Sequence, residues 1–305
     1  MRFGITKAVL SCEDFIDISR EQYESTRDAQ QKLAKVLNIE EKFNFVVENY
    51  VEYEQELLKS SLDSMMFAVP EWSDRIAEVH KVNRRLINLL TTCRLYVESR
   101  RHDIASLLGR DNGQIESLER QIADERDSNP AYRFIEALRN YAQHRSFPVH
   151  VLGHTMRTLE TNSGTFVTHT IAPRIDVAEL RTDRNFDQNM LRDLENPGHY
   201  IEIKPVLCRY IEWLGRIHTS IRGLLDERVT EWDSVIRTIQ NSYKPISDDL
   251  TGLAIVTVDD SESIGETIYV FDDYIKRRRN LVQKNRIVMN LSKHVITSEV
   301  ETNDP

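Results

Sequence analysis

Residues 204–243 read KPVLCRYIEWLGRIHTSIRGLLDERVTEWDSVIRTIQNSY and contain the longest helical pattern of the chain. Apolar residues recur there at steps of three or four over about ten turns, which is typical of a helix with one buried face. Such a helix packs along other helices or along a partner, so the segment predicts a mainly α-helical protein. Trp213 and Trp232 are interpreted as large residues of its core. The stripe consists of Ile203, Leu207, Tyr210, Leu214, Ile217, Ile221, Leu224, Trp232, Val235 and Ile239.

The same periodicity predicts further helices before this segment. Ser73 is a plausible N-cap, Pro130 suits the first turn of a helix, and Ser146-Phe147-Pro148 favours the end of that helix. The predicted helices are Glu40 to Met66, Ser73 to Arg101, about 114–126, and Pro130 to about His144.

Three other regions favour β structure. Residues 149–173 read as a β-hairpin with Asn162-Ser163-Gly164 as its turn. Short strands are expected in FGITKAVL (3–10), GLAIVTVDD (252–260) and ETIYVFDDY (266–274), and a basic helix in IKRRRNLVQKNRIVMNL (275–291). The predicted fold is therefore mainly α, a helical bundle with an inserted β-hairpin and a small α+β C-terminal piece. The expected segments are 1–70, N-terminal and helical; 71–245, the bundle with its hairpin; and 246–305, the C-terminal appendage with its basic helix.

Composition narrows the class of protein. The 305 residues carry a net charge of -9, which argues against a histone-like positive coat but leaves room for a local basic groove. No run approaches the roughly 18 apolar residues of a membrane span, and the N-terminus turns acidic before a signal-peptide core forms. Cys12, Cys93 and Cys208 are isolated and are interpreted as reduced thiols. These features predict a cytoplasmic protein with no membrane partner.

RNYAQHR, residues 139–145, is the segment with the clearest chemistry. Asn140 and His144 share one helix face, and the long Arg139 side chain reaches around the helix toward them. Arginine suits phosphate, histidine carries protons near neutral pH, and asparagine orients either group. Because RNA supplies its own nucleophile, the ribose 2′-hydroxyl, these groups suffice for cleavage without a metal.

RNYAQH resembles the R-x4-6-H motif of HEPN-domain proteins, and the resemblance extends over about residues 75–245. That superfamily consists of helical bundles, and many members are metal-independent endoribonucleases of toxin–antitoxin, phage-defence and CRISPR-associated systems. The resemblance implies Arg139 and His144 as catalytic residues and Asn140 as the orienting position. It also implies RNA as substrate, a homodimer, an antitoxin or other regulatory protein as partner, and neither metal nor cofactor.

The motif occurs four times, and its context separates the matches. Arg75 to His80 has Ile after the arginine, Arg145 to His150 is broken by Pro148, and Arg192 to His199 passes through a Pro-Gly turn. Only RNYAQH combines a helix, an apolar face before it and a polar second residue. Two alternatives remain open: a non-catalytic HEPN-like module that binds nucleotide, RNA or protein, and a salt bridge on a helix without further function.

Cations and histidines elsewhere give weaker hypotheses. RNA contact is predicted for Arg145 and for the run Lys276, Arg277, Arg278 and Arg279, since phosphate contacts dominate affinity for nucleic acid. The alternative for the run is a solvated helix face balanced by Asp272 and Asp273. His150, His154 and His169 suggest a zinc site if the hairpin brings them together, and the alternative is polar positions on an exposed hairpin face. NTPase, dinucleotide-binding and zincin motifs are absent from the sequence.

Overall fold

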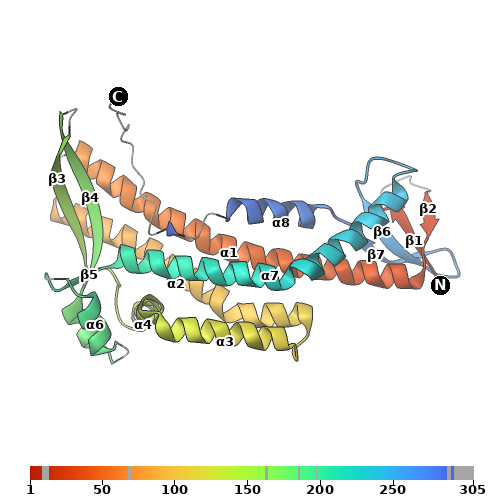
Figure 1. The fold of residues 1–305 in the computed structure, drawn as a ribbon. Helices are drawn as coiled ribbons and strands as arrows, with labels where there is room; N and C mark the ends of the chain where they lie inside the picture. Colours follow the sequence, from red (N-terminus) through yellow and green to blue (C-terminus); the bar gives the residue numbers. More distant parts are fainter. Residues whose placement is uncertain are drawn as a thin grey trace. The chain divides into compact units, whose positions relative to one another are not determined.

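The computed structural model describes residues 1–8, 14–67, 71–161, 164–184, 186–196, 198–286 and 290–291. These residues form eight helices and two small antiparallel sheets, with 66% helix (Figure 1). The prediction of a mainly α-helical protein is confirmed. None of the described helices is long and apolar enough to cross a membrane.

The elements follow one another along the chain in the order of their residue numbers. The helices are α1 (Arg20–Met66), α2 (Trp72–Leu108), α3 (Gly113–Ser128), α4 (Pro130–His144), α5 (Val177–Arg181), α6 (Gln188–Leu194), α7 (Ile203–Tyr243) and α8 (Asp273–Lys284). The strands are β1 (Arg2–Lys7), β2 (Phe15–Asp17), β3 (Val151–Thr161), β4 (Gly164–Asp176), β5 (Tyr200–Glu202), β6 (Leu253–Val258) and β7 (Ile264–Tyr269).

Helix α1 begins well before the residue that its periodicity predicts. The structure starts the helix at Arg20 instead of Glu40, and a capping box explains the difference. The backbone N–H of Gln22 donates to Ser19 Oγ at 3.1 Å, and the backbone N–H of Ser19 donates to Gln22 Oε1 at 2.8 Å. These reciprocal bonds satisfy two backbone donors at the helix start. The sequence contained this S-x-x-Q signal, but the polar residues mixed into the first turns obscured the apolar stripe.

Two compact units contain the described residues, and both are discontinuous in sequence. Unit 1 comprises 1–41, 100–114 and 219–286, and unit 2 comprises 42–99, 115–218 and 287–305, the last range described only at 290–291. The three predicted segments followed chain order instead. The difference arises because β1 pairs with β6, so the two ends of the chain contribute to one sheet. Periodicity within a segment contains no information about such long-range pairing.

Unit 1 is built on a four-stranded antiparallel sheet with the order β2-β1-β6-β7. Every residue of β6 is buried, and Ile5 of β1 pairs with Ile255 of β6 in the middle of the sheet. The predicted strands near the two chain ends are thus confirmed as β1, β6 and β7. Helices α1 and α7 are linked in this unit by Arg222, which donates to both carboxylate oxygens of buried Glu40 at 2.8 and 2.6 Å. Such a bidentate pair fixes register as well as contributing energy.

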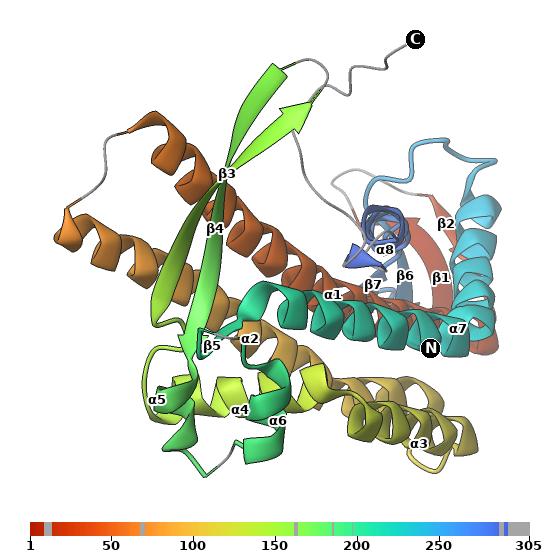
Figure 2. The same ribbon diagram turned by 60° about the vertical axis from the view of Figure 1, so that its left-hand side comes forward.

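Unit 2 contains the predicted hairpin, which is confirmed as β3 and β4 paired from Val151↔Arg174 to Thr161↔Gly164. Figure 2 shows these strands as a two-stranded ribbon, with the short, unpredicted β5 added to the β4 side. Residues 162 and 163 of the predicted turn lie outside the described residues. The ribbon is long, and its outer part is mostly exposed on both faces.

The helical core of unit 2 is aromatic. Trp213 is buried as predicted, and the ring of buried His218 stacks on Phe43 with their centroids 3.9 Å apart. Tyr96 Oη lies 2.8 Å from His218 Nδ1, so this buried histidine is satisfied by a hydrogen bond inside the core. Cys93 and Cys208 are buried free thiols, as expected, and Cys12 lies outside the described residues.

A close approach in unit 1 gives a test of the sheet. A Cβ atom on Gly4 would lie only 2.1 Å from the Phe15 ring, so Gly4→Ala must displace that ring. We expect this variant to lower the free energy of unfolding by about 1–3 kcal/mol, as overpacking does. Gly113→Ala is the matched control, because nothing lies within 4 Å of its added Cβ, and its effect should stay within about 0.5 kcal/mol. Chemical denaturation measures both, and equal stability of the two variants would contradict the packing of Phe15 on Gly4.

Candidate functional site

Helix α4 carries the RNYAQHR segment, and its start is built as the sequence predicts. Asn129 is the N-cap, and its Oδ1 accepts hydrogen bonds from the N–H groups of Ala131 at 3.0 Å and Tyr132 at 3.4 Å. Pro130 occupies the first turn, where a missing N–H costs nothing. The helix ends at His144, and the Arg145 N–H donates to Tyr141 O at 2.8 Å. Local signals therefore place the motif in the last turns of a helix.

One face of α4 is held firmly inside unit 2. Glu136 Oε2 accepts from Arg94 Nη1 of α2 at 2.6 Å, and its Oε1 accepts from Tyr210 Oη of α7 at 3.3 Å. These contacts fix the rotation of α4 about its axis. The buried apolar residues of the helix are Ala131, Phe134, Ile135, Ala137, Leu138 and Tyr141.

The three predicted catalytic residues lie in the last two turns of α4, outside its buried apolar face. Arg139 and Asn140 are half-buried, and Arg139 Nη1 donates to Asn140 Oδ1 at 3.0 Å. His144 is exposed in the last turn, and within the described part of the chain its ring has no hydrogen bond or ion pair. The structure therefore brings Arg139 and Asn140 together. Asn140 orients the guanidinium and not the imidazole, so nothing in the described chain orients the imidazole of His144.

A buried asparagine anchors the chain directly after the motif. Asn83 of α2 is fully buried, and its side-chain amide holds the backbone of Val149 at both polar atoms. Asn83 Nδ2 donates to Val149 O, and Val149 N–H donates to Asn83 Oδ1, both at 2.8 Å. Asn83 Nδ2 also lies 3.1 Å from Val79 O. This clamp fixes the path of residues 146–149 against α2, and through them the end of α4.

A second histidine returns to the buried side of the α4 end. His150 Nδ1 accepts from the Asp176 N–H at 3.0 Å, so a neutral ring carries its proton on Nε2. That Nε2 lies 3.4 Å from Tyr141 Oη. Burial lowers the pKa of His150, although the nearby Glu179 and Asp176 carboxylates oppose the shift. Pro148 interrupts the match from Arg145 to His150 in the sequence, but that same interruption turns the chain back onto α4.

Arg145, predicted to contact RNA, lies at the same helix end. Its Nε is 3.7 Å from Oδ2 of Asp183, a carboxylate that is only 3% exposed. The Arg145 side chain itself is 65% exposed, so its guanidinium still faces solvent. No sequence signal pointed to Asp183, which belongs to the short segment after α5. The α4 end therefore combines two cations with one buried carboxylate.

His80 and His199, the histidines of two other motif matches, each contact a residue other than the arginine of their match. The His80 ring packs against Phe147 with their centroids 5.3 Å apart. His199 Nδ1 lies 2.5 Å from Glu195 Oε1, and His199 has a left-handed backbone with φ of 62°. Neither arrangement places an arginine of the motif beside its histidine.

The predicted basic run lies in α8, and each of its four cations has a carboxylate partner within unit 1. Lys276 pairs with Asp272 at 3.0 Å and Arg277 with Glu41 at 2.5 Å, and these two cations are 68% and 62% exposed. Arg278 and Arg279 share Asp233 of α7 at 2.6 and 3.3 Å. Because Arg278 is only 13% exposed, its pair attaches α8 to α7. The other three cations remain accessible to phosphate.

The three hairpin histidines have separate environments. His154 Nε2 lies 3.5 Å from Glu78 Oε2, His150 is bonded to the Asp176 backbone, and His169 pairs with Met156 across the hairpin. Among the described residues, no group of three or more His, Cys, Asp or Glu side chains is placed to hold a metal ion.

The Asn83 clamp can be tested by its removal. Asn83→Ala leaves the buried N–H and C=O of Val149 without their side-chain partner, so we expect the free energy of unfolding to fall by about 2–3 kcal/mol. Asn88→Ala, at an exposed position of the same helix, should change it by less than about 0.5 kcal/mol. Urea titrations of both variants measure the difference. A loss no larger in Asn83→Ala than in the control would exclude the clamp.

The environment of His150 gives a pH dependence. Because burial lowers its pKa in the folded state, the unfolded chain binds the proton more readily. The stability that neutral His150 contributes is therefore present above its ordinary pKa of 6.5 and is lost as the pH falls through the folded value. We expect His150→Gln to lose less stability than the unchanged protein between about pH 7 and about pH 5. Exposed His102→Gln is the control, and thermal unfolding curves that are parallel for all three proteins would contradict this assignment.

No family model matches this sequence, and neither a curated protein nor a solved structure matches the chain.

Proposed function

We propose that this protein is a metal-independent endoribonuclease of HEPN type whose site is the end of α4. The observation that carries the proposal is the pairing of Arg139 with Asn140, one turn before exposed His144, on a helix that Glu136 holds against α2. A permanently charged guanidinium stabilises a phosphate and a solvent-facing imidazole moves protons, and RNA cleavage uses both functions. The resemblance of RNYAQH to the R-x4-6-H motif supports the same assignment.

The proposed reaction uses the RNA itself as nucleophile. The ribose 2′-hydroxyl loses its proton to a base and attacks the adjacent phosphorus, while the bond from phosphorus to the 5′-oxygen breaks. The products are a 2′,3′-cyclic phosphate and a 5′-hydroxyl, which receives a proton from an acid. His144 moves a proton, and Arg139, held by Asn140, stabilises the negative charge that develops on the phosphoryl oxygens.

A second copy of the chain completes the proposed site. One imidazole cannot act as base on one side of the phosphate and as acid on the other at the same moment. Two copies related by a two-fold axis bring the same helix end together twice and supply two histidines and two arginines. A partner copy also offers a group to orient His144, which the described part of one chain does not. We therefore propose a homodimer. A role in cytoplasmic stress or phage defence, with an antitoxin or other regulator, rests on the resemblance alone.

The free ring of His144 also supports a second candidate function. Asn140 is engaged with Arg139, so one chain provides a phosphate-binding group without an oriented proton carrier. A HEPN-like module that binds RNA, nucleotide or protein without cutting would need no more than this. Arg145, Lys276, Arg277 and Arg279 remain exposed enough to add phosphate contacts in either case.

Cleavage of RNA in the presence of EDTA tests the first candidate. We expect the unchanged protein to cut RNA under chelation and His144→Ala to lose activity by roughly 10²- to 10⁴-fold. Arg139→Ala should be similarly impaired, and Arg139→Lys should restore little, because an ammonium cannot reproduce the guanidinium fork. Asn140→Ala should have a milder effect, since it removes only the group that orients Arg139. Product mapping should find 2′,3′-cyclic phosphate ends.

Rival histidines provide the controls for this experiment. His80→Ala and His199→Ala remove the histidines of two other motif matches and should leave cleavage unchanged. Inactive His80 and His199 variants beside an active His144→Ala would assign the reaction to another pair. Retained RNA binding without cleavage by the unchanged protein would favour the second candidate. Loss of folding in His144→Ala, measured by circular dichroism, would show a structural role for this residue.

A further inference from the structure

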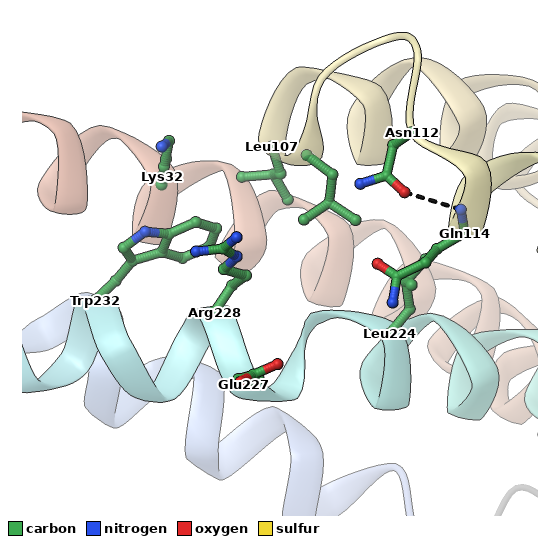
Figure 3. A pocket seen from close by; sticks show the side chains of 9 residues that line it. Lys32, Leu107, Asn112, Gln114, Leu224, Glu227, Arg228 and Trp232 are labelled. Atoms are coloured by element: carbon green, nitrogen blue, oxygen red, sulfur yellow. Dashed lines mark hydrogen bonds between the residues drawn. The ribbon is translucent and has the colours of Figure 1, made fainter.

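Unit 1 contains a pocket with a volume of about 460 Å³, which lies within the usual range of about 300–1,000 Å³ for small-molecule sites. Its walls come from α1, the end of α2, the turn before α3, the start of α3, and α7 (Figure 3). The pocket is separate from the motif residues of α4, which belong to unit 2. The lining residues are Lys32, Leu107, Leu108, Asn112, Gln114, Leu224, Glu227, Arg228 and Trp232.

One end of the pocket is cationic. Lys32 Nζ lies 5.3 Å from the centroid of the Trp232 ring, and Arg228, four residues before Trp232 on α7, also lines the pocket. Each cation has a carboxylate partner outside the pocket, Asp28 at 2.7 Å for Lys32 and Glu231 at 3.0 Å for Arg228. Both carboxylates are more than half exposed. Such exposed ion pairs contribute little to stability. Both cations are therefore able to turn toward an anion that enters the pocket.

The other end of the pocket presents two side-chain amides. Asn112 Oδ1 accepts a hydrogen bond from the Gln114 N–H at 2.9 Å, which fixes which side of the Asn112 amide faces away from the helix start. Its Nδ2 is therefore the donor that remains for a ligand. The Gln114 side chain also lines the pocket and adds a second amide with both a donor and an acceptor. Paired amide donors and acceptors match the edge of a purine, as they do in the contacts of Asn and Gln with adenine.

The remaining lining residues are three leucines and a single carboxylate. Leu107, Leu108 and Leu224 provide the apolar surface that a flat ring contacts in the pocket. Glu227 lies on the α7 side, where its carboxylate is able to accept hydrogen bonds from sugar hydroxyls. The pocket thus combines two cations, three leucines, a carboxylate acceptor and two side-chain amides.

We infer that this pocket binds a purine mononucleotide. The phosphate contacts Arg228 and Lys32, a ribose hydroxyl donates to Glu227, and the base lies on the leucines with its edge toward Asn112 and Gln114. Inorganic phosphate lacks the base and the sugar, a nucleoside lacks the anion, and a pyrimidine ring is smaller than a purine and has fewer groups for the amides to bind. The inference is independent of the proposed ribonuclease activity, because no residue of the α4 site takes part in it.

Calorimetric titration of the full chain with AMP and GMP tests this inference. We expect saturable binding of one nucleotide per chain, with adenosine, CMP and inorganic phosphate each at least about tenfold weaker. Arg228→Gln removes one charge-assisted contact and should weaken binding about tenfold or more. Asn112→Asp keeps the oxygen that caps α3 but replaces the amide donor by a carboxylate, and it should weaken binding similarly. Arg237→Gln, an exposed position on the same helix, should bind as the unchanged protein does.

Other outcomes would overturn the inference. Absence of saturable binding of AMP and GMP at millimolar concentration, or equal affinity for CMP or inorganic phosphate, would exclude a purine nucleotide site. Binding that is unaffected by both Arg228→Gln and Asn112→Asp would exclude this pocket. His144→Ala should bind the nucleotide normally even if it no longer cuts RNA. Loss of nucleotide binding in His144→Ala alone would place the ligand at the α4 end instead.

Discussion

Removal of the apolar stripe of α7 from water is the constraint on which the rest of the structure depends. The helix has 41 residues, and its inward positions are almost completely buried, with Leu207, Leu214 and Ile221 each at most 1% exposed. Burial of each such side chain stabilises the folded state by about 1.5–3 kcal/mol relative to leaving that side chain exposed. A single helix of this length cannot hide its own stripe, so α1 and α2 must be long as well. Polar pairs such as Arg222 with Glu40 then select the register among many apolar packings.

At the candidate site, too, apolar burial provides stability and polar contacts determine position. Apolar burial attaches α4 to its unit, while Glu136 and Asn83 determine how the helix is rotated and where the following chain runs. Those contacts hold the helix in place, while Arg139 is half-buried and His144 in the last turn stays exposed. The scaffold is therefore rigid next to groups that face solvent. This is the arrangement that binding and catalysis generally require.

Charge acts differently at two places within unit 1. In α8 the basic run is balanced by carboxylates of other elements, so a conspicuous sequence feature includes a buried structural pair between Arg278 and Asp233. At the pocket, Lys32 and Arg228 have only exposed partners, although neither residue stood out in the sequence. The density of cations along a chain thus says little about which of them are available. Availability depends on which carboxylates folding brings near, and on how deeply each pair is buried.

The sequence by itself determined the elements whose signals are local. Periodicity located α7 almost to the residue, Asn129-Pro130 located the start of α4, and alternation with a turn located the β3–β4 hairpin. Caps and periodicities act within a few residues, so they can be recognised before any fold is known. Only the tertiary structure decided that β1 pairs with β6, that Asn83 holds Val149, and that His150 returns to Tyr141. It alone also assembled the pocket from residues of four helices and one turn. Those contacts join residues far apart in the chain, and their partners are chosen by packing and hydrogen-bond satisfaction in three dimensions, which no local pattern encodes.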